Sequence, residues 1–136
     1  MLSKPTLSAT LVGFIFLFFS GWIFHEYLAK DFFSQHYVNM PSMMSNEINY
    51  IALGVMIEAY LLSVIYGKWA KGRFTLSSGF KLGALLGLFV GLGLNMVSLG
   101  TIELMDAKGT LVEAVWNVVY FGTAGCLNGW IYKALS

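Results

Sequence analysis

Glu58 is the residue whose type and position most directly suggest chemistry in this sequence. It interrupts an otherwise apolar segment at positions 50–67. An ionised carboxylate at the centre of a membrane helix costs about 2.5–3.5 kcal/mol on insertion scales, so it must face other helices, find donors or take up a proton. Because no lysine or arginine lies at a matching depth, we expect an intramembrane proton or cation site with neutral partners, for which Asn95, Asn117 and Tyr60 are candidates. The alternative is a protonated Glu58 that is bonded to an amide and only links two helices.

His25 and its neighbours form a second candidate site. Gly21 and His25 are four residues apart, so they share one face of a helix. A histidine beside a glycine can ligate a haem or a chlorophyll-type magnesium, with His36 as the second ligand of a haem, although a histidine that bonds at the membrane interface is the simpler interpretation. We therefore expect no cofactor. An acidic outer mouth that attracts cations could instead be lined by His25, Glu26, Glu47, Glu103, Asp106 and Glu113, or these could simply be residues that avoid the cytoplasmic side.

Other chemistry has few residues to support it. One cysteine and two histidines exclude a disulfide framework and make a zinc site implausible. No serine or cysteine has a histidine at a plausible depth to activate it, so we expect no enzymatic activity. Only 11% of the residues are charged, with eight basic against seven acidic, which excludes a basic nucleic-acid-binding face.

Membrane spans are the elements that must position these groups. The chain is 57% hydrophobic, its mean hydropathy is +0.71, and a membrane-crossing helix needs roughly 20 mostly apolar residues. We predict an all-α polytopic membrane protein, with residues 1–136 forming a single domain of four transmembrane helices in a bundle. The spans are expected at about 7–27, 50–67, 79–99 and 111–132.

The basic residues predict the orientation of these spans. Six of the eight flank the spans on one predicted side: Lys4, Lys68, Lys71, Arg73, Lys81 and Lys133. Because lysine and arginine are retained in the cytoplasm, both termini are predicted to be cytoplasmic. The long outer connection over 28–49 is rich in aromatic residues and methionine, and we expect it to form a short interfacial amphipathic helix that breaks near Pro41.

Small residues four apart mark one face of the third span. They are Gly79, Gly83, Gly87, Gly91 and Asn95, and the fourth span carries a shorter version at Gly125 and Gly129. A glycine inside a helix costs about 0.5–1 kcal/mol relative to alanine. In lipid, the close approach of another backbone offsets this cost. We expect tight helix packing, within one chain or between copies, and the alternative is a groove that receives a lipid, pigment or solute.

Two segments carry a resemblance to known proteins. These are FKLGALLGLFVGLGLNM at 80–96 and EAVWNVVYFG at 113–122. Together with the four spans, they resemble small four-helix bacterial inner-membrane proteins of unknown function, which implies a location in the bacterial inner (cytoplasmic) membrane and no particular activity. Small multidrug transporters are also short four-helix proteins with one essential membrane glutamate, but theirs lies on the first helix, so only the physical analogy of proton–cation exchange applies.

Three functions therefore stay open. The first is a non-enzymatic binding or accessory membrane subunit, which self-associates through its glycine-lined helices into a homo-oligomer or joins a larger membrane complex. The second is a small proton-coupled permease or channel that uses Glu58. The third is a pigment or haem protein ligated by His25. All three have the lipid bilayer as a partner, and none involves nucleic acid.

Overall fold

The computed structural model describes residues 2–28, 30–36, 48–101 and 106–136, and every element in these ranges is helical. The helices are α1 (Lys4–Ile23), the π-helix η1 (Phe24–Leu28), α2 (Lys30–His36), α3 (Ile48–Trp69), α4 (Leu76–Leu88), the π-helix η2 (Phe89–Leu94), α5 (Asn95–Thr101) and α6 (Ala107–Leu135). The predicted all-α class is thus confirmed for the described chain.

Four continuous helices in these ranges are long and apolar enough to cross a membrane. They are Lys4–Leu28, Ile48–Trp69, Leu76–Thr101 and Ala107–Leu135. Each extends beyond the predicted span at both ends. The extensions at two N-termini have a local cause, since Ser3 accepts a hydrogen bond from the Thr6 N–H and Asp106 accepts one from Gly109. The chain is therefore compatible with a small multi-pass membrane protein.

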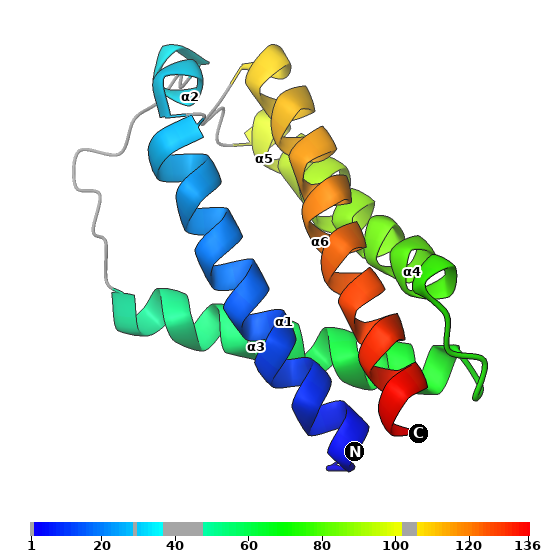
Figure 1. Cartoon of the computed structure of the whole chain (residues 1–136). Helices are drawn as coiled ribbons and strands as arrows, with labels where there is room; N and C mark the ends of the chain where they lie inside the picture. Colours follow the sequence, from blue (N-terminus) through cyan, green and yellow to red (C-terminus); the bar gives the residue numbers. More distant parts are fainter. Residues whose placement is uncertain (1, 29, 37–47, 102–105) are drawn as a thin grey trace.

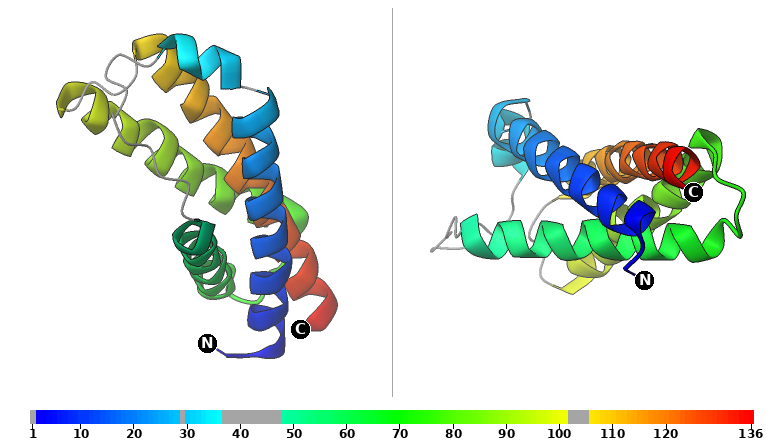
Figure 2. Two further views of the ribbon diagram at one scale, coloured as in Figure 1. Left: turned by 90° about the vertical axis from the view of Figure 1, so that its left-hand side faces the viewer. Right: turned by 60° about the horizontal axis from the view of Figure 1, so that its bottom comes forward.

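The helices are not all parallel (Figure 1). α1 and α6 run side by side in opposite directions, and α4, η2 and α5 form one bent helix along another face of α6. α3 crosses α1 steeply, and it is seen almost end-on when the molecule is turned (Figure 2). Both termini lie at the same end (Figure 1). α1 and α3 must therefore tilt in opposite senses if both cross one membrane.

Charge is sorted between the two ends of the α1–α6 pair. The basic end, where the termini lie, is formed by the start of α1 with Lys4 and the end of α6 with Lys133; further cations are Lys68 at the end of α3, Lys71 and Arg73 in the α3–α4 connection and Lys81 on α4. The opposite end of the α1–α6 pair, which we call the acidic end, is formed by η1, α2 and the start of α6, which carry Glu26, Asp31, Asp106 and Glu113 together with two lysines, Lys30 and Lys108. Which side of the membrane each end faces stays a prediction.

The closest helix contact joins the bent α4–η2 helix to α6. Added Cβ atoms at Gly79, Gly83 and Gly87 would overlap the backbone carbonyls of α6, and one at Gly91 would lie 2.6 Å from Asn117 Cβ. The contact is reciprocal, because an added Cβ at Gly125 would overlap the Gly79 carbonyl. The glycine face is thus occupied within the chain. It cannot also line an interface between copies, so any self-association must use another surface.

Tyr66 fixes the corner between α3 and α4. Its side chain is fully buried, and its hydroxyl contacts Ser78 Oγ at 2.9 Å and receives the Thr75 N–H at 3.2 Å. The connection itself turns through Lys71 and Gly72, which both have positive φ. The end of α3 and the start of α4 are therefore joined rigidly at the basic end.

The long connection over 28–49 is described only in part. It contains the short helix α2 (Lys30–His36), while 37–47, with the break expected near Pro41, lies outside the described residues. The end of α2 is held against α6. The backbone N–H of Asp106 donates to the His36 carbonyl at 2.8 Å, and the His36 ring Nδ1 lies 2.6 Å from Asp106 Oδ2.

The close helix contact predicts a position-specific effect of a single methyl group. Gly83→Ala should lower the free energy of unfolding by about 1–3 kcal/mol, because the new Cβ would overlap the Phe121 carbonyl, which is backbone and cannot rotate away. Denaturant unfolding in detergent micelles measures the change. The matched control is Gly54→Ala on α3, where nothing lies within 4 Å of the added Cβ. Equal stability of the two variants would contradict the contact.

Candidate functional site

One face of α6 carries polar side chains over most of its length. They recur at helical spacing and are Glu113, Asn117, Tyr120, Asn128 and Tyr132, which we call the polar face of α6. Asn117, Asn128 and Tyr132 are buried. Tyr120 and Tyr132 bond to the Leu17 and Ser63 carbonyls, so their part of this face turns toward α1 and α3, whereas the Asn117 Cβ packs against the Gly91 position of η2. Polar side chains inside a membrane helix cost free energy, so a row of them is a candidate functional site.

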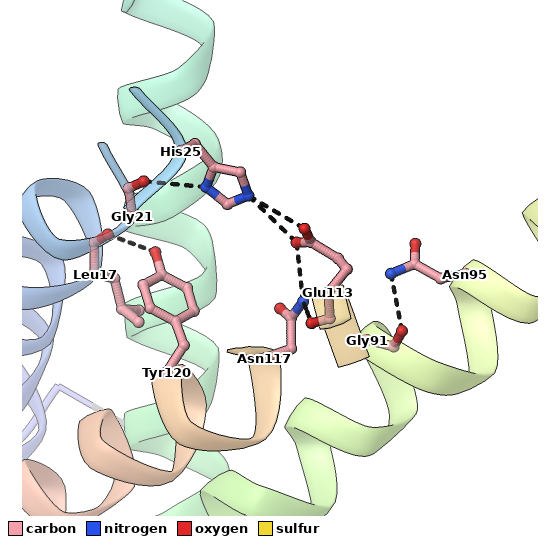
Figure 3. A network of polar contacts seen from close by, with 8 residues as sticks. All are labelled: Leu17, Gly21, His25, Gly91, Asn95, Glu113, Asn117 and Tyr120. Atoms are coloured by element: carbon pink, nitrogen blue, oxygen red, sulfur yellow. Dashed lines mark hydrogen bonds and ion pairs between the residues drawn. The ribbon is translucent and has the colours of Figure 1, made fainter. Parts of the chain in front are cut away.

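His25 of η1 meets this face at the acidic end (Figure 3). Its Nε2 atom lies 3.3 and 3.4 Å from the two carboxyl oxygens of Glu113. Asn117 then donates from Nδ2 to the Glu113 carbonyl at 2.8 Å and to its carboxyl Oε1 at 3.2 Å. The site therefore links α1 to α6 through a histidine–carboxylate pair that an amide orients.

The bonds of His25 determine how many protons the pair holds. Its Nδ1 atom lies 3.0 Å from the Gly21 carbonyl, which only accepts, so Nδ1 carries a proton. A second proton must lie between Nε2 and Glu113, because a carboxylate and an unprotonated ring nitrogen are both acceptors. With that proton on either group, the net charge of the pair is zero. The pair can thus shift a proton without changing its charge.

Tyr120 fills the space beside Gly21. The Tyr120 hydroxyl donates to the Leu17 carbonyl (Figure 3). An added Cβ at Gly21 would lie 2.9 Å from the hydroxyl oxygen of Tyr120. The room that a haem or pigment ring would need at this glycine is therefore taken by a side chain of the same protein. Both ring nitrogens of His25 are also engaged. The residues present do not fit a ring cofactor at His25.

Aromatic rings surround the pair. The rings of Phe24 and Trp116 are stacked with their centroids 3.8 Å apart, and Trp116 stacks on Tyr120 at 5.2 Å. The quadrupole of such a ring attracts a cation at a face that the stacking leaves uncovered. The acidic end of the polar face thus combines a carboxylate with a wall of aromatic rings.

Glu58 lies elsewhere, at the edge of the α3 face that packs on α1. Its neighbour Ala59 is buried, whereas Glu58 is exposed. It forms no hydrogen bond or ion pair with the described residues. Glu58 is therefore a membrane carboxylate that the described part of the chain leaves without a donor.

The structure does not gather the three residues expected as partners of Glu58. Asn117 belongs to the Glu113 site, and Asn95 donates to the Gly91 carbonyl of its own helix at 2.8 Å (Figure 3). Tyr60 is half-buried and has an interaction of its own. Among the described residues, no hydrogen bond or ion pair connects Glu58 to the polar face.

An apolar layer separates the acidic-end site from the polar groups at the basic end. Leu17, Ala59, Leu62, Phe121 and Ala124 form this buried cluster. Beyond it lies Asn128, whose side chain is 1% exposed and whose Oδ1 has no hydrogen-bond partner in the part of the chain that the structure describes. Leaving a buried amide oxygen without a partner costs about 1–3 kcal/mol, so a hydrogen-bond donor that reached Asn128 Oδ1 would be bound favourably.

Both π-helices lie next to the site formed by His25, Glu113 and Asn117. η1 contains His25, and η2 contains Gly91, which packs against Asn117. A π-turn widens the helix and is frequent at functional positions. Here η1 places His25 at the level of Glu113.

The acidic mouth predicted at the outer end is described only in part. Glu26 is exposed there, and Glu103 lies outside the described residues. Asp106 is bonded to His36 and caps α6, so it is occupied structurally. No group of three or more potential metal ligands occurs among the described residues.

Glu113 is named in the sequence analysis only as one of six residues of the acidic mouth, and its central role in this site is not predicted from the sequence. It lies at the start of the fourth span, where a carboxylate suggests a helix end in polar surroundings. Its spacing of four from Asn117 and seven from Tyr120 was the available indication. Its pairing with His25 joins residues far apart in the sequence, which spacing alone does not reveal.

Comparison with protein-family models, curated proteins and solved structures found no match to this chain. The resemblance to small bacterial inner-membrane proteins stays a prediction. The function must therefore be argued from the polar face of α6 and from Glu58.

The link between α2 and α6 predicts a dependence of stability on acid. The Gly109 N–H and then the His36 ring hold the pKa of Asp106 below its ordinary value of 3.8. Because the folded-state pKa is lowered, the carboxylate stabilises the fold above the unfolded-state pKa, and this contribution is lost as the pH falls through the folded-state pKa. The melting temperature should therefore decrease once the pH is lowered below about 4.

Asp106→Asn keeps an oxygen that can cap α6 but removes the charge. This variant should flatten the acid limb of the melting curve measured between pH 3 and 6. Glu26→Gln, at an exposed carboxylate of the same end, should leave the limb unchanged. An acid limb that persists in Asp106→Asn would assign it to other carboxyl groups.

Proposed function

We propose that this chain is a small, non-enzymatic proton-coupled permease or channel. The observation that carries the proposal is the polar face of α6, which runs from the His25–Glu113 pair to Tyr132 and is interrupted by one apolar layer. Polar side chains that cost free energy inside a membrane are typical of ion and proton pathways. The bacterial inner membrane remains the expected location.

The His25–Glu113 pair supplies a simple way to couple a proton to a cation. With one shared proton the pair is neutral. A further proton gives a cationic histidine beside a neutral carboxyl group, so the pair becomes positive and disfavours a nearby cation. Loss of that proton restores the neutral pair. Proton and cation would thus compete for the same end of the pathway.

Glu58 supplies a second exchange position. A membrane carboxylate without a donor is neutral when it binds a proton, and it attracts a cation when it releases one. A carboxylate in apolar surroundings and the aromatic rings at the acidic end both favour a lipophilic organic cation as the solute.

A second candidate is the accessory subunit that associates with another membrane chain or with a second copy. The observation that favours it is again Glu58, since a partner helix could supply the missing donor. Gly54 is four residues earlier on α3, and the space beside it is open. A second helix could approach there without touching the glycine face of α4, which α6 already fills.

Carbodiimide labelling of Glu58 tests the proposal without knowledge of the solute. A hydrophobic carbodiimide reacts with a protonated carboxyl group that is accessible from an apolar environment. We expect modification of Glu58 that decreases as the pH rises, detected by mass spectrometry of the full chain in lipid. Tetraphenylphosphonium, a lipophilic cation, should protect it. Glu58→Gln should abolish the labelling.

The control separates the two candidates. Glu113→Gln removes the proton exchange of the pair and should weaken tetraphenylphosphonium protection while Glu58 still reacts. Absence of labelling at every pH, or labelling that tetraphenylphosphonium never changes, would contradict the permease. Cross-linking between copies through Leu61→Cys, in a Cys126→Ser background, would then favour the accessory subunit, with Val115→Cys on α6 as the comparison.

A further inference from the structure

A small cavity opens at the basic end, away from the polar site discussed above. It is lined by Ser3, Thr6, Val64, Gly67, Lys68 and Tyr132. Its volume is about 180 Å³, below the roughly 300–1,000 Å³ of a pocket that encloses a drug-sized molecule. The cavity therefore suits one polar group of a ligand whose remainder lies outside.

The charge at this cavity is positive and unbalanced. Lys68 is exposed, and it forms no ion pair with any carboxylate that the structure describes. The neighbouring charges on the elements that meet here, Lys4 on α1 and Lys133 on α6, are also positive. An anion at the cavity would meet cations from three helices, so charge complementarity selects a negative group.

The hydroxyl groups of the cavity form an ordered chain. Tyr132 donates to the Ser63 carbonyl at 2.9 Å, so Thr6, 2.8 Å away, donates to Tyr132. Ser3 then donates to Thr6 Oγ1 at 2.8 Å. The Ser3 hydroxyl is the outermost of the chain, so its proton can turn toward an anion by giving up its own bond to Thr6, while the Thr6–Tyr132 and Tyr132–Ser63 bonds stay in place. Ser3 and Lys68 are therefore the available donors.

The cavity also lies at the depth where lipid headgroups would be found. Trp69 at the end of α3 and Trp130 near the end of α6 are both exposed, as aromatic residues at a membrane interface are. Leu7 and Leu11 continue from the cavity end along the exposed side of α1. Acyl chains could lie along such an apolar surface.

We propose that this cavity binds the phosphate group of an anionic phospholipid, with Lys68 as its cation and Ser3 as its hydroxyl donor. The headgroup occupies the cavity and the acyl chains remain in the bilayer. This inference does not depend on proton transport, because it uses none of the residues of the polar site apart from Tyr132, which only holds the hydroxyl chain.

Native mass spectrometry of the full chain in detergent tests the inference, with phosphatidylglycerol or phosphatidylcholine added. We expect retained phosphatidylglycerol and little phosphatidylcholine. Lys68→Gln should weaken phosphatidylglycerol binding about fivefold, the effect of removing one lysine at a membrane surface. Lys68→Arg should keep it. Lys133→Gln, which removes a lysine of the same end outside the cavity, should have a clearly smaller effect.

The remaining outcomes overturn the proposal. Equal losses in Lys68→Gln and Lys133→Gln would show that diffuse positive charge, not the cavity, attracts the lipid. Equal binding of the two lipids would remove the anionic specificity. Competition by millimolar inorganic phosphate would assign the cavity to a soluble anion instead of a headgroup. The melting temperature of each variant is measured to check that the variant remains folded. We expect no change for the Lys68 variants, because Lys68 is exposed and its replacement leaves the core intact.

Discussion

The close approach of α4 and α6 is the constraint on which the other features depend. Between membrane helices there is no hydrophobic force of the kind that acts in water, so van der Waals contact and hydrogen bonds hold them together. The glycines at 79, 83 and 87 let the carbonyls of α6 enter the face of α4. This contact fixes the rotation of α6 about its axis, so that Glu113, Tyr120 and Tyr132 reach groups of η1, α1 and α3.

That rotation makes the backbone of α1 and α3 the partner of the polar face. Tyr120 reaches the Leu17 carbonyl, and Tyr132 reaches that of Ser63. Polar groups in lipid need such internal partners. Two groups depart from this pattern in the described chain, the carboxylate of Glu58 and the amide oxygen of Asn128. A proton, a cation or a donor from a neighbouring helix would therefore be bound most favourably at these two groups.

The separation of charge divides the molecule into two chemical environments. Carboxylates and the histidines gather at the acidic end, with an apolar layer beneath them, and cations gather at the basic end around a small hydroxyl-lined cavity. The first environment suits the exchange of cations and protons. The second suits a phosphate. The two proposals therefore follow from opposite charges at opposite ends, and each can fail without the other.

The sequence by itself determined the helical class, the four membrane-length segments and the sorting of basic residues, because apolar length and charge position belong to the chain and not to its packing. It also marked the glycine face. Only the tertiary structure decided which helix fills that face, that His25 pairs with Glu113 rather than with a cofactor, and that Asn95 and Asn117 leave Glu58 without an amide. The physical reason is that a membrane helix is apolar on nearly every side, so its periodicity does not encode rotation or crossing angle, and these two quantities decide which polar groups meet.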